Sequence, residues 1–217
     1  MRSLQKKLKF TYQKPPIIIA EISGNHNGNK SRFLKLIESA CKSGADLVKI
    51  QTYEPEDITL NKKTSKYKIK NGIWKGKYLT DLYKKACTPF SWHKDAFKIA
   101  LKYKKIIFSS PFSYRGVDLL EKFKVPIYKI ASFEITDTPL IRYVASKGKP
   151  IIISTGIASK KDIELALETC KEEGNDKIAL LKCTSSYPAP ISEANLSMIK
   201  DFRNRYNVIS GLSDHTL

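Results

Sequence analysis

The chain repeats one pattern: a short run of apolar, mostly β-branched residues ends in polar residues, and a new segment follows. Ile151-Ile152-Ile153 leading into Ser154-Thr155-Gly156 shows the pattern plainly. Apolar runs of this length are typical of parallel strands that are buried on both faces. The runs predict seven strands, at 17–21, 47–51, 106–110, 125–134, 151–156, 178–182 and 208–210.

Segments with helical periodicity separate most of these runs. Helices are predicted at 33–44, 93–103, 116–122, 140–146 and 159–173. Ser159 is a good N-cap for the last of them, and Asp162 lies near the positive end of its dipole. Strands that alternate with helices indicate a parallel α/β protein, and the spacing fits a (β/α)8 TIM barrel that is truncated after about the seventh strand. A doubly wound sheet is the alternative, but no G-x-G-x-x-G motif follows the first strand.

Residues 52–91 are charged and weakly periodic. A connection of this length predicts a functional lid or a disordered segment. The formal net charge of the chain is +18, from 39 Lys and Arg against 21 Asp and Glu. Because the lysines are spread along the chain, we favour a solvated Lys-rich surface over anionic ligands or nucleic acid as the explanation. The hydrophobic fraction of 41% is enough for one sizeable core and argues against disorder.

The cysteines and the first residues exclude several classes of protein. The four cysteines show no C-x-x-C spacing, so we expect neither a disulfide framework nor a zinc site. The first 16 residues are basic but lack the apolar core of a signal peptide, and no apolar run is long enough to span a bilayer. We therefore expect a cytoplasmic protein that does not bind membranes.

Cations and hydroxyls gather where the predicted strands end. The lysines are Lys49, Lys129 and Lys182, and the serines are Ser110, Ser132, Ser154 and Ser213. The bland interpretation of each lysine is an apolar stem lying over the rim with its head in water. Active sites of parallel α/β enzymes lie at the carboxyl ends of strands, and phosphates and carboxylates take several charge-assisted hydrogen bonds at once. We therefore predict an anion site.

Two carboxylates and a histidine occupy similar positions. Glu21 and Glu134 end predicted strands and could act as general acid or base, bind substrate hydroxyls, or form structural ion pairs with Lys49 or Lys129. His215 could be a metal ligand, a base or a hydrogen-bonded core histidine. For His26, in a turn, and His93, at a helix start, we expect capping or surface roles.

Several of these motifs resemble the sialic acid (nonulosonate) synthase family. They occur in the same order as in that family, and they cover nearly all of the chain from Ile17 onward. The motifs are Ile19-Ala20-Glu21-Ile22, Asn25-His26-Asn27-Gly28, Gly44 to Thr52, Ser110-Pro111-Phe112, Lys129 to Glu134, Ser154-Thr155-Gly156 and Gly211 to Thr216. Within the family, Thr88 to Lys94 and Cys183 to Pro190 are most similar to pseudaminic acid synthases.

The resemblance implies a transferase that condenses phosphoenolpyruvate with an N-acetylated amino-sugar and releases phosphate. It implies that phosphoenolpyruvate is held by Lys49, Ser110, Lys129, Ser132, Ser154, Ser185 and Ser213. It implies that the sugar meets Glu21, Gln51, Glu134 and Tyr187, with Glu21, Glu134 and His215 as the catalytic set. His215 would bind a divalent metal ion, Mn²⁺ or Mg²⁺, which would polarise the aldehyde oxygen as a Lewis acid.

The resemblance also sets expectations about the extent of the chain. Residues 1–217 correspond to the phosphoenolpyruvate-condensing barrel domain, and family members continue with a second metal-binding histidine and a small antifreeze-like domain. They act as homodimers. Residues 1–217 alone are therefore expected to form a marginal fold and a poor catalyst, with open strand edges.

Three other functions are compatible with the sequence. An N-acetylneuraminate or legionaminate synthase is the nearest alternative. A basic nucleic-acid-binding module would need a Lys-rich stripe with aromatics, for which Lys66–Lys77 with Tyr67, Trp74 and Tyr78 is the candidate. A remnant without activity is the third. We expect phosphoenolpyruvate and an amino-sugar as partners, and no nucleic acid.

Overall fold

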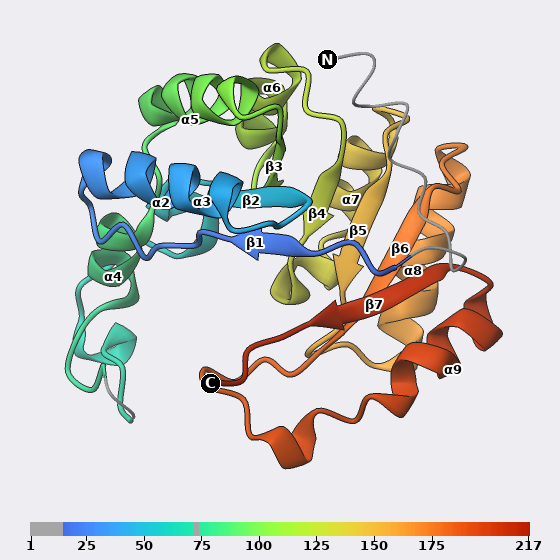
Figure 1. The fold of residues 1–217 in the computed structure, drawn as a ribbon. Helices are drawn as coiled ribbons and strands as arrows, with labels where there is room; N and C mark the ends of the chain where they lie inside the picture. The colour runs from blue at the N-terminus through green and yellow to red at the C-terminus, as the bar shows by residue number, and fades with distance from the viewer. Residues whose placement is uncertain (1–14, 72–73) are drawn as a thin grey trace. The chain divides into compact units, whose positions relative to one another are not determined.

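The computed structural model describes residues 15–71 and 74–217, and the chain divides into two compact units. The amino unit spans Ile18–Lys124, and the carboxyl unit contains Val125–Leu217. Each unit is built from parallel strands that alternate with helices (Figure 1). This architecture confirms the predicted parallel α/β class.

The amino unit contains three parallel strands in chain order. Neighbouring strands pair Glu21 with Lys49 and Gln51 with Ser110, so the predicted site residues of this unit share one end of the sheet. Its elements are β1 (Ile19–Glu21), α2 (Lys30–Lys42), β2 (Leu47–Thr52), α3 (Pro55–Ile58), η1 (Ser65–Tyr67), α4 (Leu79–Ala86), α5 (Phe90–Lys102), β3 (Ile106–Pro111) and α6 (Tyr114–Lys122).

The core of this unit lies where α2 and α5, which run side by side, meet the strands (Figure 1). Phe33 and Ile37 are one helical turn apart on α2, and both are fully buried with Val48 and Ile50 of β2. The Asn29 side chain caps α2 by accepting the N–H of Arg32, satisfying one of the donors that every helix start leaves open. Burying side chains of this size contributes about 2 kcal/mol each.

His26 is not a surface residue, which corrects the prediction. Its side chain is fully buried. Nδ1 accepts the N–H of Gly28 at 3.1 Å, and Nε2 lies 3.1 Å from Oγ1 of Thr88. An Nδ1 that accepts must be unprotonated, so Nε2 carries the hydrogen and donates to Thr88. Burial lowers the pKa of His26, and the ring stays neutral while it joins the turn after β1 to the residues before α5.

His93 is also buried, and again the predicted surface or capping role is wrong. The helix begins at Phe90, which brings His93 into its first turn. Nδ1 lies 3.2 Å from the carbonyl of Pro89, so it donates, and Nε2 accepts from Oγ1 of Thr52 at 2.8 Å. The Thr52 hydroxyl also meets Oγ of Ser109 at 2.6 Å. Burial lowers the pKa of His93 to about 4, so the ring is neutral at neutral pH.

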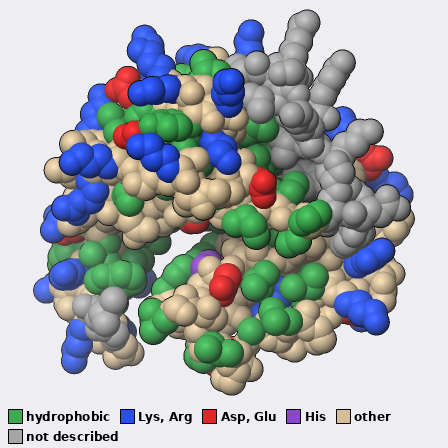
Figure 2. Space-filling model, viewed as in Figure 1, with side chains coloured by type: hydrophobic (Ala, Val, Ile, Leu, Met, Phe, Trp, Pro, Cys, Tyr) green, Lys and Arg blue, Asp and Glu red, His purple; other side chains and the backbone are tan. Residues whose placement is uncertain are grey.

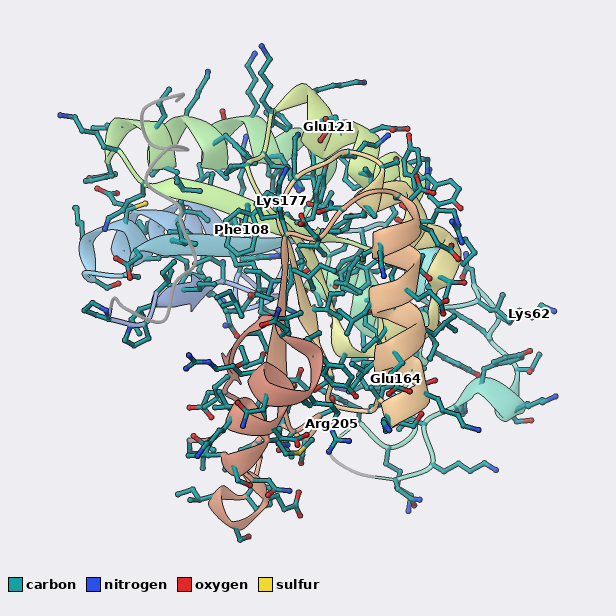
Figure 3. All side chains as sticks on the ribbon, turned by 90° about the vertical axis from the view of Figure 1, so that its right-hand side faces the viewer. Lys62, Phe108, Glu121, Glu164, Lys177 and Arg205 are labelled. Atoms are coloured by element: carbon teal, nitrogen blue, oxygen red, sulfur yellow. The ribbon has the colours of Figure 1, made fainter. Side chains whose placement is uncertain are left out.

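The described residues of the segment between β2 and α5 contain helices, so the predicted disorder is wrong for them, whereas the lid remains a prediction. These helices are α3, η1 and α4, and Lys68 forms an antiparallel bridge with Tyr78 while its ammonium lies 5.6 Å from the centroid of that ring. Lys62 projects outward from the connection between α3 and η1 (Figure 3). On the visible face, basic side chains are scattered rather than gathered in one stripe (Figure 2).

The carboxyl unit contains four parallel strands, again in chain order. Cys183 of β6 lies opposite Ser213 of β7, and Lys129 of β4 lies opposite Ile152 of β5. Its elements are β4 (Tyr128–Ile130), η2 (Ser132–Thr136), α7 (Thr138–Ala145), β5 (Ile151–Ser154), α8 (Lys160–Glu172), β6 (Ile178–Cys183), η3 (Ile191–Glu193), α9 (Ser197–Tyr206) and β7 (Ile209–Ser213).

The helix boundaries of this unit follow local chemistry. The Ser159 side chain accepts from Asp162 N–H and the Asp162 carboxylate accepts from Ser159 N–H, a capping box that confirms the predicted start of α8. The predicted strand 125–134 is too long: it ends at Ile130, and Ser132–Thr136 forms a 3₁₀ turn. Helix α9 was not predicted from the sequence.

The cysteines and the lengths of the helices bear on two predictions made from the sequence, that there is no disulfide framework and no membrane-spanning segment. All four cysteines are free in the structure. Within residues 15–71 and 74–217, no helix is both long and apolar enough to cross a membrane.

Candidate functional site

In the amino unit, Lys49 contacts two of the other strand-end residues, Glu21 and Ser110. Its ammonium forms an ion pair with Glu21 and lies 3.5 Å from Oγ of Ser110. The Lys49 side chain is 15% exposed, whereas Glu21 is 37% exposed. The structural ion pair weighed for Glu21 is therefore present. Gln51 lies beside Ser110 in the register, so β2 and β3 bring three of the predicted residues together.

In the carboxyl unit, Lys129 is buried at the end of β4, with 4% of its surface exposed. Its ammonium donates to the carbonyl of Ile130 at 2.7 Å and to Oγ of Ser154 at 2.6 Å. Because the Ser154 oxygen accepts from the lysine, the single hydrogen of that hydroxyl is left to donate elsewhere. The pair thus presents a cation and a hydroxyl donor, the groups that bind a phosphate or a carboxylate best.

Two further hydroxyls, those of Ser132 and Ser185, lie beside Gly156 in the loop that follows β5. Oγ of Ser132 accepts the backbone N–H of Gly156 at 3.0 Å, so the Ser132 hydroxyl hydrogen is also directed to another acceptor. The Ser185 hydroxyl approaches the same glycine closely. Ser132, Ser154 and Ser185 therefore follow three different strands within one unit. The strand-end pattern predicted Ser132 and Ser154, and the family resemblance implied Ser185.

Glu134 is half-buried on the 3₁₀ turn after β4. Among the residues that the structure describes, its Oε2 atom is shielded from water and has no hydrogen-bond partner. Burial raises the pKa of Glu134 to about 7, and the positive charge of Lys129 only partly opposes this effect. A carboxyl group with such a pKa exchanges a proton near neutral pH, which is what a general acid or base requires.

His215 is held in one orientation by three neighbours. Its Nδ1 lies 2.8 Å from the carbonyl of Thr184 and 3.8 Å from Sγ of Cys183, and the Tyr187 ring packs over it with centroids 4.2 Å apart. The His215 carbonyl in turn accepts the N–H of Ala189 at 2.8 Å. A carbonyl cannot donate, so Nδ1 carries a hydrogen, and in the neutral ring Nε2 is the nitrogen with the lone pair.

This arrangement fits a metal ligand. Metal-binding histidines commonly donate their other ring N–H to a carbonyl, which fixes the tautomer. In the part of the chain that the structure describes, however, no group of three or more His, Cys, Asp and Glu side chains is placed to hold an ion. His215 can therefore supply one metal ligand. The other ligands would have to be supplied by groups other than such a cluster, for example by substrate or water.

The structure thus brings most of the predicted residues together within their own units. In the carboxyl unit, Ser213 lies opposite Cys183, while Lys182 donates to the Cys183 carbonyl at 2.8 Å and to Thr184 Oγ1 at 3.1 Å. Sequence reasoning did not single out Gly156 or Cys183. Cys183 is the last residue of β6, and Gly156 lies two residues after the end of β5. Their positions at strand ends were the signal that could have identified them.

Parallel strands that alternate with helices and carry polar side chains at their carboxyl ends place the chain among the (β/α)-barrel class of proteins. The NeuB family model matches residues 36–217. The chain is 44% identical over 207 residues to a pseudaminic acid synthase of Campylobacter jejuni, and 44% identical over 203 residues to that of Helicobacter pylori. The structure of a sialic acid synthetase from Leptospira borgpetersenii, determined in complex with citrate, matches with a TM-score of 0.85 and 30% identity. The chain belongs to the NeuB family.

The matches cover nearly all of this chain but a smaller share of each relative. The Campylobacter and Helicobacter alignments cover 95% and 94% of this chain but 60% of each relative. The Leptospira structure is matched over 97% of this chain and 68% of its own. The chain therefore spans about 60% of the length of its curated relatives. The match also bears out the predicted barrel-type fold.

Proposed function

We propose that the protein is a transferase that condenses phosphoenolpyruvate with an N-acetylated amino-sugar, giving a nine-carbon sugar acid and phosphate. The observation that carries this proposal is the buried Lys129–Ser154 pair beside the Ser132–Gly156 pair, in a chain of the NeuB family. The reaction joins C3 of the enol to the aldehyde carbon of the sugar. Water adds at C2, and phosphate leaves with cleavage of the C–O bond.

Phosphoenolpyruvate carries a phosphate and a carboxylate, and each needs several donors. In the carboxyl unit, Lys129, Ser132, Ser154, Ser185 and Ser213 are proposed to bind it. In the amino unit, Lys49 and Ser110 are proposed to do so. Burial supports this role for Lys129, because a charge-assisted hydrogen bond away from water contributes about 1.5–3 kcal/mol.

The sugar is proposed to meet Glu21, Gln51, Glu134 and Tyr187. Glu134 is the proposed general acid, because its Oε2 can hold a proton near neutral pH and release it to the aldehyde oxygen as the new C–C bond forms. Glu21 is exposed enough to accept sugar hydroxyls while it pairs with Lys49. Tyr187 is 67% exposed, so it is accessible to a sugar, and its ring packs against that of His215 with centroids 4.2 Å apart.

A divalent ion, Mn²⁺ or Mg²⁺, is proposed as the cofactor, with Nε2 of His215 as one ligand. When bound, such an ion supplies Lewis-acid polarisation of a carbonyl oxygen. The protein's own contribution is orientation: the Thr184 carbonyl fixes the tautomer, and the Tyr187 ring limits rotation of the imidazole.

Replacing His215 with alanine is expected to lower the affinity for Mn²⁺ by at least about tenfold, because even loss of a partner that only orients a ligand costs 10- to 100-fold. Electron paramagnetic resonance of Mn²⁺ titrated into the full-length protein measures this affinity without any turnover. Ser210→Ala is the matched control, because Ser210 lies on β7, five residues before His215, donates to the Ile199 carbonyl of α9 and is not a proposed ligand. Equal Mn²⁺ affinity in all three proteins would remove His215 from the metal site.

The pseudaminic acid precursor, a 2,4-diacetamido hexose, is the proposed sugar, because both curated relatives described above are pseudaminic acid synthases. N-acetylneuraminate or legionaminate synthesis remains the alternative. Phosphate release from phosphoenolpyruvate, measured with each of the three sugars in turn, tests the proposal. The sugar with the highest kcat/KM decides among them, and no phosphate with any of them overturns the function.

The resemblance also supports a homodimer and a cytoplasmic location for the complete protein. Light scattering tests the first, and fractionation of cells tests the second. Nucleic acid is the competing partner for a basic chain. Binding to DNA or RNA that weakens with salt, together with no phosphate release, would favour it.

A further inference from the structure

Three side chains of the carboxyl unit pack closely around Gly156: those of Ser132, Ser185 and Cys183. A Cβ atom at this position would lie 2.1 Å from Oγ of Ser185, 2.9 Å from Oγ of Ser132 and 3.1 Å from Sγ of Cys183. In real structures, Cβ atoms essentially never lie closer than 3.0 Å to such neighbouring heavy atoms. Three polar side chains therefore occupy the space that any larger residue would need.

The backbone of Gly156 does not explain why glycine is found there. Its φ lies outside the left-handed region, unlike Gly148 and Gly174, which end α7 and α8 with positive φ. An L residue could adopt the Gly156 conformation without backbone strain. Alanine would differ from glycine at this position because its Cβ atom would lie too close to the Ser185 and Ser132 hydroxyls.

The backbone N–H of Gly156 has a second effect. It donates to Oγ of Ser132 at 3.0 Å, which occupies one lone pair and leaves the hydroxyl hydrogen for another acceptor. Ser132 is 7% exposed, so water competes little for that hydrogen. The glycine therefore acts on two hydroxyls: it orients that of Ser132 and leaves room for that of Ser185.

We propose that Gly156 is a positioning residue that sets the Ser132 and Ser185 hydroxyls as donors to the anionic groups of phosphoenolpyruvate. The inference rests on the proposed function. Because glycine has no side chain, the Ser132 and Ser185 hydroxyls can both lie against position 156, and a single phosphate or carboxylate is proposed to receive both hydrogens. A methyl group here displaces the Ser185 hydroxyl first, because it is the nearest atom and the side chain is only part-buried.

Gly156→Ala is expected to raise the KM for phosphoenolpyruvate ten- to a hundredfold, because hydrogen bonds to a charged group are lost. The KM for the sugar and the melting temperature should change little. Steady-state kinetics on the full-length protein, with calorimetric binding of phosphoenolpyruvate alone, measures the split. Gly211→Ala is the matched control, since its added methyl group meets only the flexible side chain of Leu181 at 3.1 Å.

A second-site variant separates positioning from general damage. In Ser185→Ala the nearest clashing atom is gone, so adding Gly156→Ala to that variant should weaken phosphoenolpyruvate binding at least threefold less than it does in the wild type. An equal effect in both backgrounds, or a matched rise in both KM values, overturns the inference. If wild type binds phosphoenolpyruvate but Gly156→Ala binds it equally well, only this inference fails. If wild type neither binds it nor turns it over, the proposed function fails.

Discussion

Replacing Lys129 with alanine is expected to weaken phosphoenolpyruvate binding about ten- to a hundredfold, while binding of the sugar changes little. The lysine is 4% exposed and donates to Ser154 at 2.6 Å, so its charge acts where water screens it poorly. Losing a charge-assisted contact to the anion costs about 1.5–3 kcal/mol. Isothermal calorimetry with phosphoenolpyruvate, and kinetics with each substrate varied, measures both effects.

Lys177→Ala is the matched control for that variant. Lys177 is exposed and lies directly before β6, which is separated from β4 by β5, and its ammonium donates to the Gly148 carbonyl at 3.1 Å. Figure 3 labels this residue. Both variants remove one positive charge from the same unit, so a general electrostatic effect would weaken binding equally in each. An unchanged affinity in Lys129→Ala, with activity retained, would exclude Lys129 from the site.

Glu134→Gln is expected to lower kcat by about 100-fold or more and, at the same time, to stabilise the protein at pH 8. General acid–base groups typically contribute a factor of 100 to 10,000 in rate. Glutamine has nearly the same shape as glutamate but cannot release a proton. It also carries no charge, so it avoids the cost of burying a carboxylate whose Oε2 has no partner among the described residues.

The pH dependence of this stabilisation has a definite sign. Below about pH 4.5 the carboxyl is protonated in both the folded and the unfolded chain, so it contributes no difference. As the pH rises, the unfolded chain loses the proton first, because burial raises the folded-state pKa of Glu134 to about 7. Stability therefore falls between pH 4.5 and 7 by about 3 kcal/mol and stays low above that range.

Urea denaturation of wild type and Glu134→Gln at pH 4.5, 6 and 8 checks this prediction. The difference between their unfolding free energies should grow with pH and level off above 7. Glu164→Gln on the exposed surface of α8 is the control, because its ion pair with Lys160 is 3.5 Å long and such exposed pairs contribute little. A Glu134→Gln protein that is less stable than wild type at pH 8 would contradict the buried-carboxylate explanation.

Much of the fold was predictable because local chemistry decides it. The apolar run at Ile151–Ile153 can be buried on both faces only as an internal strand, and the capping box of Ser159 and Asp162 fixes where α8 begins. The serines and lysines at strand ends could also be predicted. Parallel strands carry their carboxyl ends to the same edge of a sheet, so these residues meet once the strands pair.

Other features depend on partners far away in the chain, and local patterns do not contain them. His26 and His93 are buried, and their partners Thr88 and Thr52 lie 62 and 41 residues away in the sequence. Glu134 acquires its raised pKa from burial on a 3₁₀ turn, where the sequence predicted a continuing strand. Helix α9 was missed because its apolar side is short, and only Phe202 in it is buried.

The hydrogen bond between His26 and Thr88 also has a consequence for the order in which the chain folds. It closes a loop of 62 residues, whereas Lys129 and Ser154 are separated by 25. Loop-closure entropy makes the longer contact costlier by about 0.8 kcal/mol before any packing is gained. Contacts between sequence neighbours form sooner than distant ones. On these terms the Lys129–Ser154 pair assembles early in folding, and the turn after β1 becomes ordered late.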